Sequence, residues 1–492
     1  MDILSFIGRM LQGGFGNLAA YLAAHVLLCL VPAFFIAGAM TALIPKESVT
    51  RFLGRSAPKF VSYPAAALAG SVLAVCSCTI VPLFAGIYKK GAGLGPAITF
   101  LFFAPAANIL ALVYTGGVIG ADLAFARLFL SLIFGIGIGM IMALIFRRDD
   151  IAHDKAADAL FSGGRGMHRA ALVFLLLLVA LLLSGTLKVP VLTQTYAQVS
   201  LPVSGTDRFQ ETLSQLVPFD PAKGEEGVSV QGVVLIGLLA LIGVASWLGF
   251  ENIHAGYNAW TWISLGLVGL TLMVAALGVV PQAQGARILI TGKLFGVMIA
   301  LVLLWVLARY RLEEQEVRDW LWESWRFVKQ IFPLLVIGVF AVGVIRVVIK
   351  PEWIEALAGQ NTLLGNLAGV VFGVFMYFPT LVEVPIAKMF LSLGMHRGPL
   401  LAYLMADPEL SLQSILIVAT IIGRLKSWTY VFWVALFSTL AGLIYGSWVD
   451  GASIGSVALY LAGFLVVLSV ALWWVSRRNH VVTTPGIATS SR

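Results

Sequence analysis

The chain of 492 residues is too apolar to be a water-soluble protein, because 60% of its residues are hydrophobic and 11% are charged. A soluble domain carries roughly 25% charged residues, so the composition predicts a polytopic membrane protein. The net charge of +8 requires no nucleic-acid partner, because Lys and Arg collect at the cytoplasmic ends of membrane helices. The 50 glycines and 19 prolines indicate broken helices, which lipid tolerates where protein or a cavity satisfies the freed backbone groups.

The amino terminus lacks a secretory signal and predicts an amphipathic lead-in helix over residues 1–19. Runs of about 20 apolar residues, the length that crosses a hydrocarbon core about 30 Å thick, follow along the chain. The eleven predicted crossings lie near 20–44, 93–116, 121–146, 170–187, 230–249, 258–280, 287–309, 330–349, 398–420, 428–446 and 455–476.

The positions of Lys and Arg predict the orientation of these crossings. Basic residues cluster after the first, third, seventh and last crossings, whereas the loop at 188–229 carries few and 447–454 carries none. Because basic loops mark the cytoplasmic side, we expect the amino terminus outside, the loop at 188–229 outside and the carboxyl terminus in the cytoplasm.

Two apolar segments, 61–90 and 364–393, are too long for one crossing and too short for two. A re-entrant hairpin, which enters and leaves on one side, preserves the orientation of every other loop. We therefore predict a hairpin at each segment.

An internal repeat relates the two hairpins. With a shift of 303 residues and no gap, Gly70–Gly120 matches Gly373–Gly423, and most identical pairs are glycine or proline, which dictate backbone geometry. The predicted orientations make unit 1 (20–147) and unit 2 (330–446) inverted relative to each other, a recurring transporter plan. The predicted fold is thus an all-α polytopic membrane protein with two inverted repeats, re-entrant hairpins and broken helices. A central four-span insertion (148–329) separates the units, and a last span with a cytoplasmic tail (447–492) follows them.

The predicted hairpin tips carry the first candidate binding residues. Two cysteines in a local turn can direct both sulfurs at one soft metal or metalloid centre, although a buried free cysteine is often only a small hydrophobe, as we expect for Cys29. The candidates are Cys76, Ser77, Cys78 and Thr79 before Pro82 in the first hairpin, and Thr380 before Pro385 in the second.

A broken span follows each hairpin, at Pro105 and at Pro408, because proline removes a backbone hydrogen bond. Asn108 and Ser411 occupy equivalent positions after these prolines. Carboxylates at membrane depth are costly and usually face a functional interior, so we expect Glu383, Asp407 and Glu409 to contact substrate or couple transport to protons. Two alternatives stay open: Asp407 and Glu409 lie nearer the interface, or Glu383 pairs with Lys388.

Other charged and aromatic residues receive structural interpretations. We expect Asp122 with Arg127, and Arg424 with Lys426, to anchor or pair at span ends. The run of Trp320, Trp322 and Trp325 with Arg318 and Arg326 predicts an interfacial amphipathic helix. No nucleotide-binding, zinc-hydrolase or nucleophile-elbow motif is found, so we expect a transporter that uses an ion gradient, needs no cofactor and is not an enzyme.

The segment VCSCTIVPLFAGIYKKGAGLGPAITFLFFAPAANI, residues 75–109, resembles the predicted-permease family that includes the bacterial organoarsenical efflux permeases. The resemblance covers the two units and not the central insertion. It implies a bacterial inner-membrane protein of two inverted units that extrudes trivalent organoarsenicals in exchange for protons, with Cys76 and Cys78 binding arsenic as a transient dithiolate.

Three functions stay open from the sequence. The first is a secondary permease that exports a soft, thiol-reactive solute, and the second is a permease for another small solute or a metal ion. The third is a non-transporting membrane scaffold subunit in which the repeat is only architectural.

Overall fold

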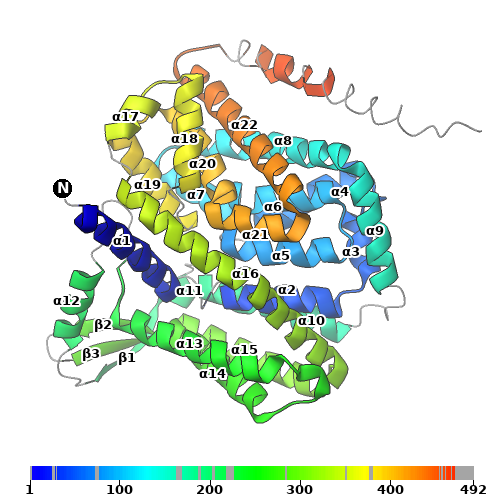
Figure 1. The fold of residues 1–492 in the computed structure, drawn as a ribbon, viewed down its shortest axis with the longest axis vertical. Helices are drawn as coiled ribbons and strands as arrows, with labels where there is room; N and C mark the ends of the chain where they lie inside the picture. The colour runs from blue at the N-terminus through cyan, green and yellow to red at the C-terminus, as the bar shows by residue number, and fades with distance from the viewer. Residues whose placement is uncertain are drawn as a thin grey trace, which may run out of the picture.

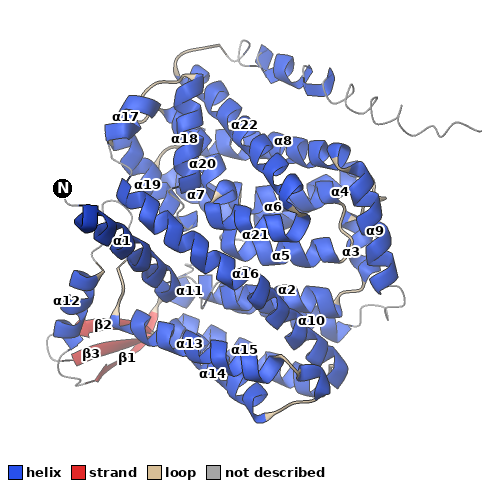
Figure 2. Cartoon of the chain, viewed as in Figure 1, coloured by secondary structure: helices blue, strands red, loops and turns tan. Residues whose placement is uncertain are grey.

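Helices dominate the computed structural model (Figures 1 and 2). It describes residues 3–24, 28, 30–72, 77–161, 169–186, 190–201, 206–217, 227–282, 285–348, 352–375 and 380–453, and parts of 455–470. Within these residues, seven helices are long and apolar enough to cross a membrane, or eight if one bent pair counts as a single span. The protein is therefore a polytopic membrane protein of helices.

The first part of the chain is entirely helical where it is described. Its helix α1 begins at Ile3, so the predicted lead-in helix and the start of the first predicted crossing form one element. The helices are α1 (Ile3–Ala24), α2 (Val31–Leu43), α3 (Lys46–Leu53), α4 (Lys59–Val72), α5 (Ser77–Lys89), α6 (Leu94–Ala106), α7 (Ile109–Val118), α8 (Ala121–Ile145) and α9 (Arg147–Phe161).

The central insertion adds a helix bundle and a small sheet that the sequence did not predict. The helices are α10 (Arg169–Thr186), α11 (Pro190–Thr193), α12 (Thr206–Leu216), α13 (Val230–Phe250), the 3₁₀ turn η3 (Ile253–Ala255), α14 (Ala259–Ala276) and α15 (Gly292–Tyr310). Strands β1 (Thr195–Leu201), β2 (Gly278–Gln282) and β3 (Gly285–Thr291) form an antiparallel sheet of order β1-β3-β2. The sheet lies beside α12 at one end of the bundle (Figure 2).

The second part of the chain returns to long helices. They are α16 (Glu314–Val348), α17 (Glu352–Ala358), α18 (Leu363–Phe375), α19 (Thr380–Ser392), α20 (Arg397–Leu410), α21 (Leu412–Ile422) and α22 (Arg424–Val449). The last predicted crossing, 455–476, is described in part, and its residues 461–466 and 468–470 are helical.

Helix α16 corrects the prediction of a separate interfacial helix. The tryptophan-rich run and the next crossing form one helix of 35 residues. Trp320 and Trp325 are buried in protein, and their indole N–H groups donate to the Phe35 carbonyl and the Glu251 carboxylate, both at 2.9 Å. Hydrogen bonds from Lys329 and then Trp325 lower the pKa of Glu251, which links α16 to the end of α13. Both indoles thus pack in the protein with their N–H groups satisfied, as buried tryptophans usually require.

Helices separated by 303 residues begin at equivalent positions. The helices α5 to α8 begin at Ser77, Leu94, Ile109 and Ala121, and α19 to α22 begin at Thr380, Arg397, Leu412 and Arg424. The glycines that end two of these elements also correspond: Gly91 and Gly394 have φ of 88° and 90°, a conformation that L side chains rarely adopt. The predicted hairpins therefore coincide with α4–α5 and α18–α19, although their tips, 73–76 and 376–379, lie outside the described residues.

Close helix contacts repeat as well. A Cβ built on Gly139 of α8 would lie 2.6 Å from the Gly95 carbonyl oxygen of α6, and a Cβ on Gly442 of α22 would lie 2.6 Å from the Gly398 carbonyl oxygen of α20. Small residues let membrane helices approach at backbone distance. Equivalent glycines thus set the same helix spacing in both parts of the chain.

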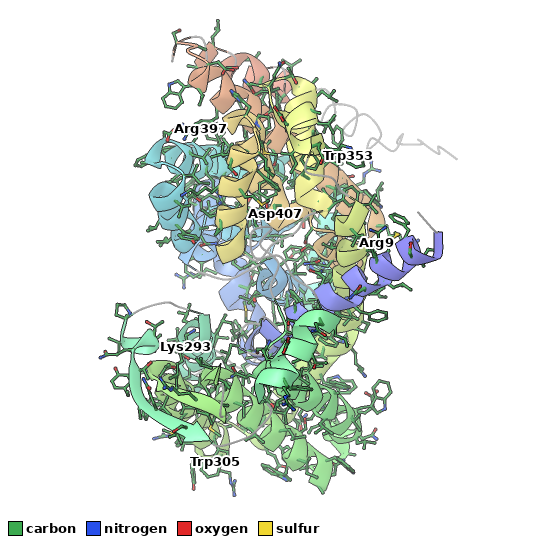
Figure 3. The ribbon with its side chains drawn as sticks, turned by 90° about the vertical axis from the view of Figure 1, so that its left-hand side faces the viewer. Arg9, Lys293, Trp305, Trp353, Arg397 and Asp407 are labelled. Carbon is green, nitrogen blue, oxygen red and sulfur yellow. The ribbon has the colours of Figure 1, made fainter. Side chains whose placement is uncertain are left out.

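The repeated helices also pack against one another across the chain. Helix α2 contacts α16, α6 contacts α20 and α8 contacts α22, so each contacts its own counterpart. Helix α5 packs on α21, and its counterpart α19 packs on α7. The central bundle contacts this body through α1, α2 and α16, below it in Figures 1 and 3.

We expect Gly442→Ala and Gly139→Ala each to destabilise the protein by about 1–3 kcal/mol, because the added methyl group meets a backbone carbonyl that cannot move alone. The control is Gly243→Ala in α13, where a Cβ meets nothing within 4 Å. Thermal unfolding in detergent measures the effect. Equal melting temperatures for the three variants would contradict the close-packing argument.

Candidate functional site

A buried ion pair joins two helices that are far apart in the sequence. Arg127 in α8 and Glu383 in the first turn of α19 have no solvent exposure, and Arg127 Nη2 lies 2.5 Å from Glu383 Oε1. Arg127 Nε also donates to the Ala106 carbonyl at 2.6 Å, and Nη1 donates to Thr115 Oγ1 at 3.3 Å. One guanidinium therefore connects α6, α7, α8 and α19.

The break between α6 and α7 explains why the guanidinium lies there. Helix α6 ends at Ala106, directly after Pro105, and the last carbonyls of a helix lack intrahelical donors. A cation is favoured at this negative end of the helix dipole, and an anion is favoured in the first turn of α19, where Glu383 lies. The geometry of the two helix ends thus stabilises both members of the ion pair.

The equivalent place in the second unit carries different chemistry. Tyr430 is the counterpart of Arg127, and Glu409 is the counterpart of Ala106, at a shift of 303 residues. The Tyr430 hydroxyl donates to Glu409 Oε2 at 2.8 Å, and both residues are buried. Helices α20 and α21 meet here at a bend of 44°. A hydrogen bond between a tyrosine and a carboxyl group therefore replaces the bond between the arginine and the backbone carbonyl.

Asp407 and Glu409 both lie in the protein interior. Asp407 on α20 has no exposed surface, and Glu409 has 4%. Figure 3 shows Asp407 within the main helix body, away from Lys293 and Trp305 on the central bundle. Both carboxyl groups are therefore covered by protein, and the alternative that they lie nearer the membrane interface stays open.

The structure places the other predicted site residues at the helix breaks and in the paired helices. Asn108 caps α7 by accepting from the Ala111 N–H at 2.8 Å, and Ser411 caps α21 in the same way from Ser414. Thr79 is buried near the start of α5. Pro82 lies inside α5, Pro385 inside α19, Pro105 at the end of α6, and Pro408 near the end of α20.

Of the two predicted thiol ligands, the structure describes the backbone of Cys78. Cys76, like Cys29, lies outside the described residues. The backbones of Ser77 and Cys78 form the start of α5, and that of Thr380 forms the start of α19. Within the described part of the chain, no three His, Cys, Asp or Glu side chains gather as metal ligands.

Two predicted charge pairings were wrong. Asp122 does not pair with Arg127; it accepts from Arg397 at 2.9–3.0 Å and from the Tyr445 hydroxyl at 2.7 Å. Glu383 pairs with Arg127, whereas Lys388 is exposed. The signal that could have identified Arg127 is its place inside an apolar helix of 25 residues, since a charge at membrane depth is usually functional.

Further ion pairs tie the two units together at the helix ends. Arg397 of α20 holds Asp122 of α8, and Lys426 of α22 lies 3.2 Å from Asp149 of α9. Each pair joins a helix of the first part of the chain to a helix of the second. The first pair joins units 1 and 2, and the second joins unit 2 to α9, which follows unit 1.

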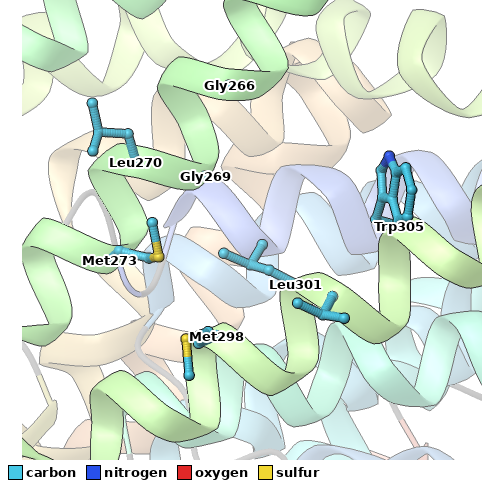
Figure 4. A pocket seen from close by; sticks show the side chains of 8 residues that line it. Gly266, Gly269, Leu270, Met273, Met298, Leu301 and Trp305 are labelled. Carbon is cyan, nitrogen blue, oxygen red and sulfur yellow. The ribbon is translucent and has the colours of Figure 1, made fainter.

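A separate apolar groove of about 350 Å³ lies on the central bundle (Figure 4). Its lining comes from α14 and α15 and includes Leu270, Met273, Met298, Leu301 and Trp305. It offers no charged side chain and includes none of the residues of the ion pair. The groove therefore has the chemistry of a surface for lipid chains and not of a polar transport site.

We expect Arg127→Met and Glu383→Gln each to destabilise the protein by about 3–5 kcal/mol, because each leaves a buried charge without its partner. The double variant Arg127→Met with Glu383→Gln should lose less than the sum of the two. Lys426→Ala is the control, since its partner Asp149 is more than half exposed and such pairs contribute about 0–1 kcal/mol. Additive losses in unfolding measurements would show that the two side chains are not coupled.

Comparison with known proteins places this chain in a family. UPF0718 protein MJ0584 of Methanocaldococcus jannaschii is 31% identical over 453 residues, covering 91% of this chain and 98% of that protein. UPF0718 protein YraQ of Escherichia coli is 28% identical over 118 residues, covering 24% of this chain and 34% of that protein. No solved structure matches the chain.

The family description "predicted permease" matches residues 12–447, and this range includes the central insertion, which the sequence resemblance did not cover. The alignment with the archaeal relative is also too long to omit that insertion. The protein belongs to the predicted permease family.

Proposed function

We propose that the protein is a secondary-active permease that moves a small solute between units 1 and 2, with the Arg127–Glu383 ion pair at its centre. The observation that carries this proposal is the burial of that pair beside two helix breaks, one in each unit. Ionisable residues at membrane depth typically mark a solute or ion pathway. Broken helices supply the backbone groups and helix ends that such pathways use.

The contacts support an inverted arrangement of the two units. Residues that the basic-loop rule assigns to one side meet in the structure: Lys426 contacts Asp149 on the predicted cytoplasmic side, and Arg397 contacts Asp122 on the predicted outer side. Helices α5 and α19 exchange partners, packing on α21 and α7. An approximate twofold axis in the membrane plane relates units in this way.

The solute that we propose is a soft, thiol-reactive one such as a trivalent organoarsenical. By the repeat, residues 76–78 correspond to 379–381, which come one turn before Glu383. Thr79, the next residue after them, is buried, and α5 packs on the broken helix α21. We therefore assign Cys76 and Cys78 to this solute, because thiolates suit a soft metalloid.

The remaining polar groups line the same region in this proposal. Ser77, Thr79, Asn108, Thr380, Asp407, Glu409 and Ser411 would contact the solute or its coupling ion, with export driven by a proton gradient across an inner membrane. A permease for another small solute keeps the carboxyl groups and does not need the thiols. A scaffold needs neither.

Uptake of radiolabelled methylarsenite into everted vesicles, with and without a proton gradient, tests the function. We expect gradient-dependent accumulation that Cys76→Ser with Cys78→Ser reduces to the level of vesicles without the protein, because the soft ligands are lost. Cys29→Ser is the matched control and should transport normally. Methylarsenite transport that survives loss of both thiols would contradict the role proposed for Cys76 and Cys78, and no accumulation by the unaltered protein would refute the arsenical proposal.

Single-cysteine labelling tests the inverted topology. With the native cysteines replaced, Lys89→Cys should react with a membrane-impermeant maleimide from the cytoplasmic side and His396→Cys from the outside, because basic loops stay in the cytoplasm. The equivalent reaction at Asp450→Cys, whose residue pairs with His396 at 2.9 Å, is the internal control for the outer side. Labelling of Lys89→Cys and His396→Cys from one side would disprove the inversion.

A further inference from the structure

The carboxyl groups at the centre outnumber the cations that can neutralise them. Glu383 and Glu409 are buried near each other, and Arg127 is the cation that acts on both carboxyl groups. Arg127 contacts Glu383 directly, so this pair is neutral together. An ionised carboxylate without such a partner costs several kcal/mol in a low-dielectric interior. A second charge at Glu409 would therefore need another source of stabilisation.

The surroundings of Glu409 supply little stabilisation for an ionised carboxylate. Oε2 accepts from the Tyr430 hydroxyl at 2.8 Å, while Oε1 has no hydrogen-bond partner among the described atoms and is closed off from solvent. A carboxylate usually needs several donors or a cation when it is buried. One neutral hydroxyl suits a protonated carboxyl group, with the proton on Oε1 and the carbonyl oxygen at Oε2.

The helices around α20 bring few charges to Glu409. Helices α6, α18 and α21 contain no titratable residue within their bounds. Three titratable side chains from neighbouring helices interact with Glu409: Tyr430 of α22, Glu383 of α19 and Arg127 of α8. Asp407 lies on α20 together with Glu409. The other charged residues of these helices, Asp122, Lys388, Arg397, Arg424 and Lys426, are paired at helix ends or exposed.

We propose that Glu409 is the proton-binding group of the transport cycle, with Tyr430 as the residue that positions its carboxyl, and that Glu383 stays ionised with Arg127. This assignment rests on the permease function proposed above. An aqueous hydronium ion protonates Oε1 while the site is open to water on one side, and the neutral carboxyl then persists in the closed state. When the bend between α20 and α21 opens to water on the opposite side, the O–H bond breaks and water there accepts the proton. No electron transfer or further reactant is needed.

Infrared difference spectroscopy of the reconstituted full-length protein, recorded between acidic and alkaline buffer, tests the proton site without any solute. We expect a carboxyl C=O band that is lost in Glu409→Gln. In Tyr430→Phe the band should remain but move to higher wavenumber, because the carbonyl loses its hydrogen bond. Asp407→Asn is the matched control on the same helix and should keep the C=O band that is lost in Glu409→Gln. An unchanged spectrum in both Glu409→Gln and Tyr430→Phe would overturn the assignment.

Transport measurements separate the proton role from a structural one. We expect Glu409→Gln to retain solute exchange between vesicles loaded and bathed with methylarsenite, a process without net proton movement, and to lose gradient-driven accumulation. Glu383→Gln should lose both activities. Gradient-driven transport by Glu409→Gln would overturn the proton assignment while leaving the permease function intact. If the unaltered protein transports no methylarsenite, the proposed solute fails, and the infrared result still decides the proton site.

Discussion

The cost of burying a charge in lipid determines how the centre of this protein is built. A guanidinium in the second turn of the apolar helix α8 is tolerated because Glu383 neutralises it and because the break after Pro105 leaves the Ala106 carbonyl free to accept from it. The same break would be unfavourable without a donor. The helix break and the ion pair therefore stabilise each other, and neither is expected to persist alone.

Glycine determines how closely the helices around this centre approach. In both units, α6 with α8 and α20 with α22 meet through glycines whose hydrogens face a carbonyl of the partner helix. Lipid provides no hydrophobic force between helices, so this close packing must supply the association energy. This spacing also sets the distance from the backbones of Arg127 and Tyr430 to the two helix breaks, so that each side chain can contact one of them.

The local features of the fold could be predicted from the sequence, whereas the long-range pairs could not. Prolines, glycines and capping residues act on their own backbone, so the segments 61–90 and 364–393 and the breaks after Pro105 and Pro408 were placed near their observed helix ends. Arg127 and Glu383 are far apart along the chain, and the nearby Asp122 and Lys388 offered local partners that tertiary packing overrode. The strand β3 was missed because its short apolar run joins the helix that follows, and hydrophobic periodicity does not separate the two.

The two units have helices that begin at equivalent positions, and they differ in the charged side chains that they bury. Where unit 1 has Arg127 and a backbone carbonyl, unit 2 has Tyr430 and the carboxyl of Glu409. A symmetric pair of arginines would place two cations in one low-dielectric region, and a symmetric pair of carboxyls would leave both without a cation. The asymmetry instead combines one permanent, neutralised ion pair with one carboxyl group that is held by a weak donor. Corresponding helices therefore hold two different buried polar pairs: the Arg127–Glu383 ion pair and the Tyr430–Glu409 hydrogen bond.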